Sequence, residues 1–288
     1  FDLGRGARAA LNARALHIIA EAQKLAYADR NHYLADPDFV HIPPGLLETR
    51  YLERRRALIA PLRAGEHVKA GNPGDESAQL FGDDTTVEAS GTSHISIIDG
   101  AGNALAMTTT IEAAFGSRLW AAGFLLNNEL TDFSFRPSDA QGRPIANRVA
   151  GGKRPRSSMA PTIVLDAAGD VKAVVGSPGG SRIILYVVKS LVALIDWEMD
   201  AQAAASLTNF GSQGGAFELE STSASAYDVL TRPWAWGSTL WQALRLKPFG
   251  HRIDFDLMTS GTHIVLRRGP SQLEGGADPR REGVALGD

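Results

Sequence analysis

The first sixty residues show the three- and four-residue spacing of apolar side chains that is typical of amphipathic helices. Leu16, Ile19 and Tyr27 follow this spacing with charged residues between them, which predicts a helix over residues 11–30. A proline-rich stretch then ends it, because proline cannot continue a helix. We expect a second, charged helix within residues 46–62. Residues 63–91 lack either periodicity and are interpreted as an exposed linker or processing loop.

From residue 92 onward, apolar and polar side chains alternate as they do in half-buried strands. Residues 93–111 hold two such runs joined at residues 99–102, which predicts a hairpin. Residues 161–180 repeat the pattern. Two further strands are expected at residues 251–257 and 260–268, before a polar tail.

A continuous apolar run lies between these strands. Residues 181–195 follow a Gly-Gly pair and are interrupted by Lys189, which predicts a buried helix too short to span a bilayer. The order of hairpins, helix and further strands indicates an α+β fold with antiparallel pairing rather than a doubly wound parallel sheet. Residues 222–249, which contain three tryptophans, are predicted only as mixed loop and helix.

Composition and charge narrow the range of functions. The 288 residues include 29 Lys and Arg against 32 Asp and Glu, and the net charge of -3 gives no basic field that would favour nucleic acid. The sequence has no cysteine, which excludes a thiol nucleophile, a disulfide framework and a Cys-ligated zinc site. The seven histidines show no paired spacing typical of metal ligands. We therefore expect neither a metal nor an organic cofactor.

Hydroxyl side chains dominate the candidate chemistry. A Ser-His-Asp triad is not supported, because there is no Gly-x-Ser-x-Gly elbow and His94 alternates with Ser93 and Ser96, as a structural histidine on a strand would. A hydroxyl can still act without histidine if it begins its chain, since its own α-amine, with a pKa of about 7.7 to 8.0, serves as the base. Thr92 would become such a residue if the bond to Gly91 were cut. Glycine there would tolerate the strained geometry of self-cleavage.

A second candidate element is the stretch "GSPGGS" at residues 176–181, between an expected strand and an expected helix. Backbone N–H groups in such a turn can hold an anion or an oxyanion. Most glycine-rich turns between a strand and a helix are only turns, and most Gly-Thr pairs at the start of a strand are surface turns. Neither feature alone therefore identifies a function.

Five sequence blocks together carry a resemblance to a known family. They are "TSHISIIDGAGNALAMTTT", "GFLLNNELTDFS", "GKRPRSSMAPTIV", "GSPGGSRI" and "GGADPRREG". Their order and approximate spacing resemble the γ-glutamyltransferase family of N-terminal nucleophile hydrolases. The resemblance implies a four-layer αββα sandwich in which Thr92 opens a central strand. It also implies that residues 1–91 are the C-terminal portion of a large subunit with its processing loop, and that residues 92–288 are the small subunit.

The same resemblance implies roles for individual residues. The catalytic positions are Thr92 as nucleophile and self-cleavage site, Thr110 as the threonine that orients it, and Gly179 and Gly180 as the oxyanion hole. The positions that bind a γ-glutamyl group are Ser157 and Ser158 for its α-carboxylate, and Glu112, Glu129 and Asp132 for its α-ammonium. Glu112 departs from the family's usual Asn, and it either enters the pocket or faces solvent or a basic side chain at the rim. An arginine that completes the carboxylate clamp is expected outside this chain.

The implied activity is hydrolysis or transfer of the γ-glutamyl group of glutathione and related γ-glutamyl amides. The partners would be a small-molecule donor, an amino-acid or short-peptide acceptor and the remainder of the large subunit, with no nucleic acid and no membrane span. Because the chain begins at Phe1 without Met, we expect it to be the edge of a fragment or of a processed chain. The resemblance suggests a periplasmic or secreted location. The alternatives are a cephalosporin- or glutaryl-acylase of the same fold and an unprocessed, non-catalytic fragment.

Overall fold

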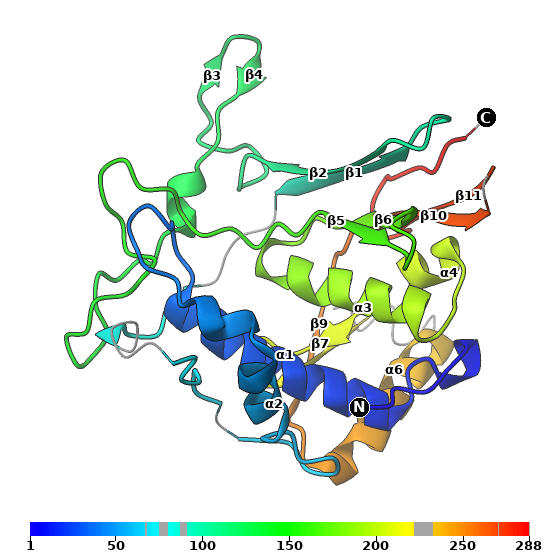
Figure 1. The fold of residues 1–288 in the computed structure, drawn as a ribbon, viewed down its shortest axis with the longest axis horizontal. Helices are drawn as coiled ribbons and strands as arrows, with labels where there is room; N and C mark the ends of the chain where they lie inside the picture. The colour runs from blue at the N-terminus through cyan, green and yellow to red at the C-terminus, as the bar shows by residue number, and fades with distance from the viewer. Residues whose placement is uncertain (67, 75–79, 87–90, 222–232, 270, 288) are drawn as a thin grey trace.

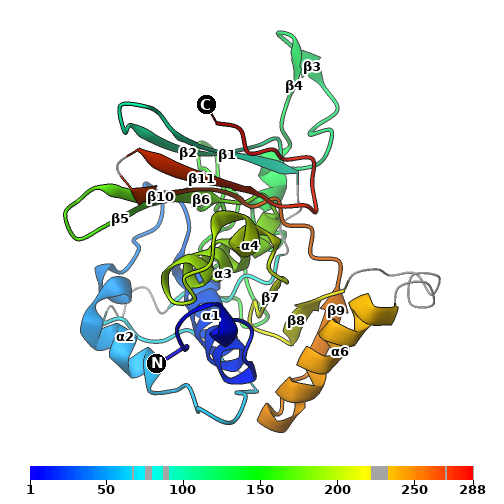
Figure 2. The ribbon, with the colours of Figure 1, turned by 90° about the vertical axis from the view of Figure 1, so that its right-hand side faces the viewer.

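The computed structural model describes residues 1–66, 68–74, 80–86, 91–221, 233–269 and 271–287, with only the backbone described at 233–238 (Figures 1 and 2). The helices are α1 (Ala13–Tyr33), α2 (Thr49–Arg56), α3 (Ile183–Ile195), α4 (Ala201–Ser206) and α6 (Pro233–Leu246). The strands are β1 (Thr92–Ile98), β2 (Ala104–Thr110), β3 (Trp120–Ala121), β4 (Phe124–Leu125), β5 (Thr162–Leu165), β6 (Val171–Gly176), β7 (Phe210–Gly211), β8 (Phe217–Glu220), β9 (Ile253–Asp256), β10 (His263–Gly269) and β11 (Gln272–Ala277).

Helix α1 confirms the first predicted helix. Asn12 caps its N-terminus, because the Asn12 side chain accepts a hydrogen bond from the Ala15 N–H at 2.9 Å. Leu16 and Ile19 belong to the main hydrophobic core, together with Trp197 from the connection between α3 and α4. The apolar spacing read from the sequence therefore marks the face that α1 buries.

The segments after α1 differ in part from the prediction. Helix α2 is eight residues long and covers only part of residues 46–62, because residues up to Leu47 belong to the 3-10 turn Pro44–Leu47 and the helix ends at Arg56. Residues 63–91 were expected to be an exposed linker, but Asp84 is only 2% exposed and Gly82 forms a bridge with Ile145. The expectation is wrong at these positions, because the buried Asp84 carboxylate pairs with Arg156.

A four-stranded antiparallel sheet forms the centre of the fold. Its order is β11-β10-β6-β5, and Val174 of β6 pairs with Ile163 of β5 and Val265 of β10. The hairpin β5–β6 and the strand β10 were predicted. The expectation of a polar tail after residue 268 is wrong, because β11 pairs with β10 there. The sequence of β11, "QLEGGA", has no clear alternation, so backbone pairing rather than a buried face defines this strand.

Helices cover one face of this sheet and the β1–β2 pair covers the other (Figure 2). Helices α3 and α4 pack against β6, β10 and β11, and the core between them includes Val175, Ile264 and Leu266. Strands β1 and β2 pair in antiparallel fashion and lie against β6 and β10 on the opposite face. The fold is therefore α+β, and the described elements stack as helices, a four-stranded sheet and a strand pair.

The strand pair and the sheet approach each other closely at one glycine. A Cβ atom at Gly176 would lie 2.1 Å from Cε1 of the His94 ring, so only glycine fits against that ring. Ser96 Oγ donates to the His263 carbonyl oxygen at 3.2 Å. Polar and small residues therefore fill the interface between the two layers.

The outer face of β1–β2 is apolar and exposed. The alternation that predicted these strands is confirmed, but four of their large apolar side chains face away from the four-stranded sheet, while Ile98 is buried. Ile95 pairs with Met107 and Ile97 with Leu105, and their exposed fractions are 41%, 43%, 48% and 44% in that order. Four neighbouring apolar side chains form one patch, which is the kind of surface that packs against another element.

Helix α3 is buried, as predicted, and contains a buried lysine. Lys189 is 0% exposed, and its Nζ donates to the Leu207 carbonyl oxygen and to Asn209 Oδ1, both at 2.8 Å. Burial lowers the pKa of Lys189 to about 7. The two acceptors offset part of the cost of removing the amine from water. Within the described ranges, no helix combines the length and apolar character that a bilayer crossing requires.

Several short strands were missed by the sequence pattern. Strand β9 lies within residues 251–257, where a strand was predicted, whereas β7 and β8 were not predicted. Strands β7, β8 and β9 form a separate sheet in which β8 and β9 run parallel, so the expectation of antiparallel pairing is wrong there. Helix α6 lies between β8 and β9 in the chain and provides the long connection that parallel strands need. Strands β3 and β4 have two residues each, which is too short for alternation to be recognised. Residues 222–232 of the region predicted as mixed loop and helix lie outside the described residues, as do the Trp234 and Trp236 side chains.

We predict that Gly176→Ala destabilises the protein by about 1–3 kcal/mol, because the added methyl group overpacks the contact with His94. Gly100→Ala is the matched control, since a Cβ there meets nothing within 4 Å. Urea unfolding of both variants measures the effect. Equal unfolding midpoints for Gly176→Ala and the unsubstituted protein would contradict the close approach.

Candidate active site

Thr92 is the first residue of β1, and its side chain belongs to the inner face of the strand pair. It is 6% exposed and pairs across the hairpin with Thr110, the last residue of β2. Thr92 follows Gly91 in an uncleaved chain, so its nitrogen belongs to a peptide group. The geometry is therefore that of the state before any self-cleavage.

The carbonyl group of Gly91 has a hydroxyl neighbour. Thr110 Oγ1 donates to the Gly91 oxygen in a long hydrogen bond of 3.4 Å and accepts from the Glu112 N–H at 2.8 Å. A Cβ at Gly91 would lie 2.1 Å from the Glu112 carbonyl oxygen. Tolerance of strained geometry was the expected reason for this glycine, but Gly91 is not among the glycines with positive φ. Close approach to the backbone at residue 112 is the reason that the structure gives.

Seven of the predicted site residues meet at one small pocket. Its lining consists of Thr92, Thr110, Glu112, Asp132, Ser157, Ser158, Met159, Gly180 and Ile183. Two predicted residues, Glu129 and Gly179, are not part of that lining. The lining residues come from segments far apart in the sequence, so only the folded chain brings them together.

The pocket lining includes two buried carboxyl groups. Glu112 is 4% exposed and Asp132 is 8% exposed. Glu112 follows β2 with a φ of 71°, which is rare for a residue other than glycine. Asn128 Nδ2 donates to Glu112 Oε2 at 3.1 Å. Glu112 was expected either in the pocket or at its rim, and it lies in the pocket wall. Glu129 is half-buried at the start of the 3-10 turn Glu129–Asp132.

The two serines are adjacent in sequence, but one is buried and the other is exposed. Ser158 is 5% exposed, and its Oγ accepts a hydrogen bond of 2.5 Å from Arg30 Nη2 of α1. Ser157 is exposed, and its Oγ accepts from the Met159 N–H at 3.1 Å. Arg30 was missed by the sequence analysis, because 128 residues separate it from Ser158 and no local pattern links them.

The glycine turn between β6 and α3 has backbone conformations that favour glycine. Gly179 has a φ of 142° and Gly180 a φ of 57°. Gly179 packs against Tyr186, where a Cβ would lie 2.5 Å from the ring atom Cε2. The Tyr27 hydroxyl donates to the Ser181 carbonyl oxygen at 2.5 Å. Helices α1 and α3 therefore hold the turn in place, with Gly180 facing the pocket.

His94 has the surroundings of a structural histidine. Its Nδ1 lies 2.8 Å from Thr108 Oγ1 and its Nε2 lies 3.0 Å from Ser96 Oγ. Burial, with a smaller contribution from His263, lowers the pKa of His94 to about 4. The ring is therefore neutral at pH 7, and both of its nitrogens already have partners.

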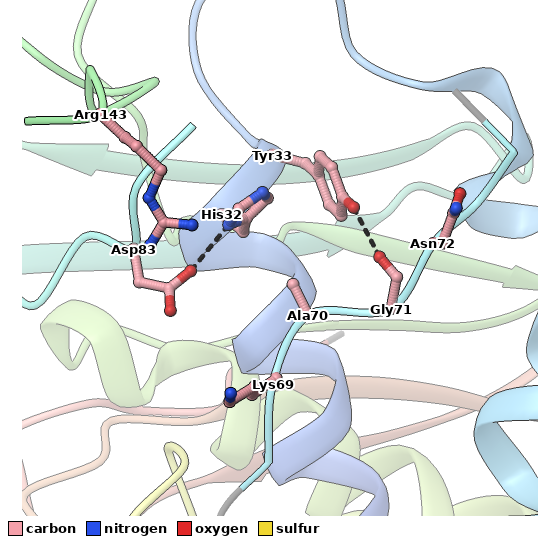
Figure 3. A pocket seen from close by; sticks show the side chains of 8 residues that line it. All are labelled: His32, Tyr33, Lys69, Ala70, Gly71, Asn72, Asp83 and Arg143. Atoms are coloured by element: carbon pink, nitrogen blue, oxygen red, sulfur yellow. Dashed lines mark hydrogen bonds and ion pairs between the residues drawn. The ribbon is translucent and has the colours of Figure 1, made fainter. Parts of the chain in front are cut away.

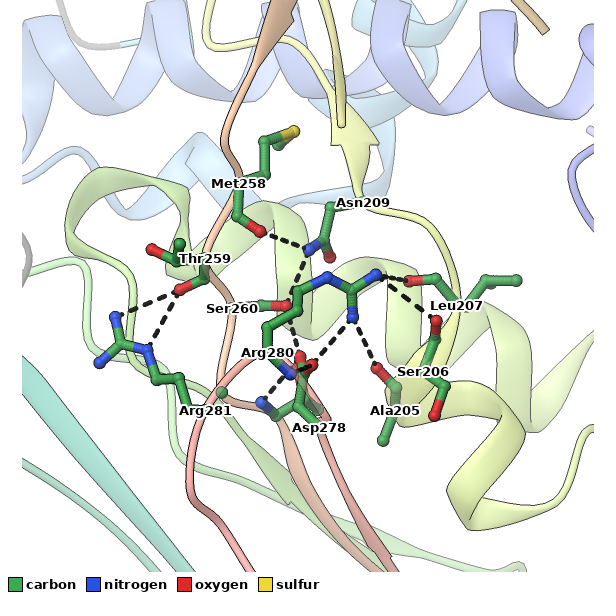
Figure 4. A network of polar contacts seen from close by, with 12 residues as sticks. Ala205, Ser206, Leu207, Asn209, Met258, Thr259, Ser260, Asp278, Arg280 and Arg281 are labelled. Atoms are coloured by element: carbon green, nitrogen blue, oxygen red, sulfur yellow. Dashed lines mark hydrogen bonds and ion pairs between the residues drawn. The ribbon is translucent and has the colours of Figure 1, made fainter. Parts of the chain in front are cut away.

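The C-terminal segment contacts the backbone of Thr92. Arg281 Nη1 donates to the Thr92 carbonyl oxygen at 3.4 Å. Arg281 Nη2 donates to the Thr259 carbonyl oxygen at 3.2 Å (Figure 4). Asp278, three residues earlier, is buried and accepts from Ser260 Oγ and, at 2.9 Å, from Arg280 Nη1. The block "GGADPRREG" therefore holds the C-terminal segment beside β1, which begins at Thr92. Sequence order alone does not reveal this contact.

One cluster in the described part of the chain has the residue types of a metal site. The candidate ligand atoms of His17, Glu21 and His251 lie within 4.8 Å of one another. However, His17 Nδ1 lies 2.8 Å from His251 Nε2, and His17 Nε2 lies 2.8 Å from the Ala60 carbonyl oxygen. The Lys24 ammonium donates to Glu21 at 2.7 Å, where it would repel a cation. We therefore assign no metal to this cluster.

A larger hollow lies away from the predicted residues (Figure 3). It has a volume of about 270 Å³, and its lining consists of His32, Tyr33, Lys69, Ala70, Gly71, Asn72, Asp83 and Arg143. His32 Nδ1 lies 2.7 Å from Asp83 Oδ1, and the Tyr33 hydroxyl donates to the Gly71 carbonyl oxygen at 2.5 Å. None of the predicted site residues belongs to this lining, and we assign no catalytic role to it.

The fold and the pocket define an α+β protein with hydroxyl and carboxyl groups gathered where a buried strand begins. The family model for gamma-glutamyltranspeptidase matches residues 2–288. A glutathione hydrolase proenzyme of Pseudomonas sp. (strain A14) is 36% identical over 292 residues, which cover 96% of this chain and 47% of that protein. The chain therefore belongs to the γ-glutamyltranspeptidase family, as the five sequence blocks indicated. It spans about half the length of the curated relatives it matches.

Solved structures agree with this assignment. A mutant of the γ-glutamyltranspeptidase of Helicobacter pylori aligns with a TM-score of 0.54 and 34% identity, covering 66% of this chain and 100% of that chain. The cephalosporin acylase of Bacillus halodurans aligns with a TM-score of 0.73 and 22% identity, covering 95% of this chain and 45% of that one. The second likeness shows a shared fold alone.

We predict that the free energy of unfolding falls as the pH decreases from about 6.5 to about 4. The folded state keeps His94 neutral down to a pKa of about 4, whereas in the unfolded chain this histidine takes up a proton near its ordinary pKa of 6.5. The contribution of this residue is about 3 kcal/mol, because one pKa unit corresponds to about 1.4 kcal/mol. Urea unfolding at pH 7, 6, 5 and 4 measures it, with His94→Gln expected to flatten the profile. His41→Gln, at an exposed histidine, is the control, and an identical pH profile for His94→Gln and this control would refute the prediction.

Proposed function

We propose that the natural protein containing this chain is a γ-glutamyl hydrolase or transferase whose nucleophile is Thr92, set free as an N-terminal residue by self-cleavage after Gly91. The observation that carries this proposal is the convergence of Thr92, two buried carboxyl groups and Ser158 on one pocket. Membership in the family supports it, and the relative from Pseudomonas is named a glutathione hydrolase proenzyme. Glutathione and related γ-glutamyl amides are accordingly the proposed donors.

The self-cleavage step follows from the position of Thr92 after Gly91. Thr92 Oγ attacks the Gly91 carbonyl carbon, and the bond from that carbon to the Thr92 nitrogen breaks, which leaves an ester and a free amine. Water then hydrolyses the ester to a carboxylate at Gly91 and restores the hydroxyl. Thr110 Oγ1, at 3.4 Å from the Gly91 oxygen, is placed to stabilise the negative charge that develops there.

Turnover of a donor repeats the same chemistry on another carbonyl group. The free α-amine of Thr92 takes the hydroxyl proton while Oγ attacks the γ-amide carbon, and the N–H groups of Gly179 and Gly180 hold the oxyanion. The amine then passes the proton to the leaving amine, and a γ-glutamyl ester remains on Oγ. Water hydrolyses the ester, or the amine of an amino acid or short peptide accepts the γ-glutamyl group. These steps use groups of the chain itself and need no cofactor.

The charge distribution of the pocket supports recognition of a glutamyl group. Glu112 and Asp132 would hold its α-ammonium, because carboxylates favour a cation, and half-buried Glu129 lies outside the lining. Ser157 and Ser158 would bind its α-carboxylate. The Arg30 guanidinium donates to Ser158 and adds a positive charge beside that serine. The lining therefore supplies groups that suit both charged ends of an α-amino acid.

The four-layer αββα sandwich and the subunit boundary belong to the same proposal. The apolar outer face of β1–β2 supports a fourth layer, because helices packed there would cover Ile95, Ile97 and their partners on β2. We assign residues 1–91 to the large subunit and residues 92–288 to the small subunit. The remainder of the large subunit is the proposed source of the covering layer. A periplasmic or secreted location is proposed from the family alone.

We predict that Thr92→Ala, made in the natural gene product that contains this chain, abolishes both self-cleavage and γ-glutamyl turnover. The same oxygen acts as nucleophile in the two reactions, so one substitution removes both. Ser93→Ala is the matched control, since Ser93 is exposed on the outer face of the same strand. Mass spectrometry of the products and release of p-nitroaniline from γ-glutamyl-p-nitroanilide measure the two activities. Normal subunit formation in Thr92→Ala would refute the assignment, and an uncleaved unsubstituted protein would favour the non-catalytic alternative.

A second prediction concerns the charge of Glu112. Glu112→Gln keeps the acceptor for Asn128 but removes a negative charge, so a donor with an α-ammonium should lose an interaction of about 1–3 kcal/mol. The ratio of kcat/KM for γ-glutamyl over glutaryl donors should fall about ten- to a hundredfold, and Glu112→Asn should act in the same direction. Steady-state kinetics with both donors measure this ratio. An unchanged ratio would show that Glu112 does not read the ammonium, and higher activity of the unsubstituted protein on the glutaryl donor would favour the acylase alternative.

A further inference from the structure

Two segments that contribute to the proposed glutamyl pocket are joined by one buried amide. Asn147 is 0% exposed, and its Nδ2 donates to the Asp132 carbonyl oxygen at 2.8 Å. Its Oδ1 accepts from the Arg156 N–H at 2.9 Å. Asp132 lines the pocket, and Arg156 directly precedes Ser157, which also lines it. Asn147 therefore links the two segments that carry these lining residues.

A buried ion pair holds that amide in one orientation. Arg156 Nη2 lies 3.2 Å from Asp84 Oδ2, and the same oxygen accepts from Asn147 Nδ2 at 3.3 Å. The side chains of Arg156 and Asp84 are 5% and 0% exposed. Removing one partner of such a pair leaves a buried charge uncompensated, and the network tolerates few other arrangements.

The ion pair also spans the proposed cleavage site. Asp84 precedes the bond between Gly91 and Thr92, and Arg156 follows it. Arg156 Nη1 additionally makes a long hydrogen bond of 3.5 Å to the carbonyl oxygen of Arg30, the residue whose guanidinium contacts Ser158. After cleavage, the same contacts would connect two polypeptides. The pocket would thus be held to the upstream polypeptide by buried charges rather than by the chain.

We propose that Arg156, held by Asp84, is a positioning residue for γ-glutamyl binding. Through Asn147 it sets the distance between Asp132 and the serines at 157 and 158. The identity of the ligand in this inference rests on the proposed function. Neither Arg156 nor Asp84 lines the pocket, so the pair acts on the placement of binding groups and not on proton transfer. Loss of placement should therefore raise KM more than it lowers kcat.

The kinetic test uses the natural gene product that contains this chain and γ-glutamyl-p-nitroanilide as donor. Arg156→Met should raise KM about ten- to a hundredfold, with a smaller change in kcat. Arg156→Lys keeps a cation for Asp84 and should recover most of the affinity. The double variant Asp84→Asn/Arg156→Met removes the buried charge, so its thermal stability should recover while its KM stays high. Lys24→Met, which leaves Glu21 buried without its ammonium, is the matched control for destabilisation and should not change KM.

Hydrogen–deuterium exchange provides a second readout that does not require a donor. Arg156→Met and the double variant should increase exchange in residues 129–134 and 156–160, whereas Lys24→Met should not. If the unsubstituted protein turns over no γ-glutamyl donor, the proposed function fails and the exchange data still decide the positioning role. Unchanged exchange in both segments would overturn the inference. A folded double variant with the same KM as the unsubstituted protein would also overturn it.

Discussion

The contact between the His94 ring and Gly176 is the constraint on which the rest of the site depends. It fixes how closely the β1–β2 pair approaches the four-stranded sheet, and the His94 carbonyl oxygen lies 2.6 Å from His263 Nδ1 of that sheet. Thr92 lies two residues before His94 on β1, while the glycine turn begins directly after Gly176 on β6. The spacing between Thr92, the proposed nucleophile, and the glycine turn proposed as the oxyanion hole is therefore set by the spacing of the two layers. A close-packed interface holds such a distance more firmly than a loop would.

The residues proposed to bind the glutamyl group are positioned in a different way. Asp132 and Ser158 lie on irregular segments, so no ladder of strand hydrogen bonds sets their separation. Buried polar groups perform this task instead, because each of them is costly to leave without a partner and the network has few alternative arrangements. The proposed catalytic groups are thus positioned by packed sheets, and the proposed binding groups are positioned by buried polar and charged side chains. Substitutions in the two parts should consequently affect different kinetic constants.

The sequence predicted elements wherever local order carries the signal. Alternation gave the hairpin that begins at Thr92, and apolar spacing gave α1 and α3. The sequence pattern could not predict β11, because that strand is defined by its backbone pairing with β10. It also could not predict the parallel pairing of β8 and β9, because these strands are joined by a long connection. The five blocks led to nine candidate residues, seven of which line one pocket, and their roles stay proposals. Arg30, Asp84 and Arg156 were missed because their partners lie far away in the sequence and a single charged residue has no periodicity.

The β1–β2 pair also shows why alternation alone does not reveal which face is buried. Alternation normally places apolar side chains toward the core, yet here Ile95 and Ile97 face outward while Thr92 and His94 face the sheet. The proposed nucleophile Thr92 must face the inner side of the strand pair to line the pocket. Because successive side chains point to opposite faces, Ile95 and Ile97, at odd spacing from Thr92, face outward. Their burial requires a further layer, so the placement of the proposed nucleophile on one face determines the architecture expected on the other.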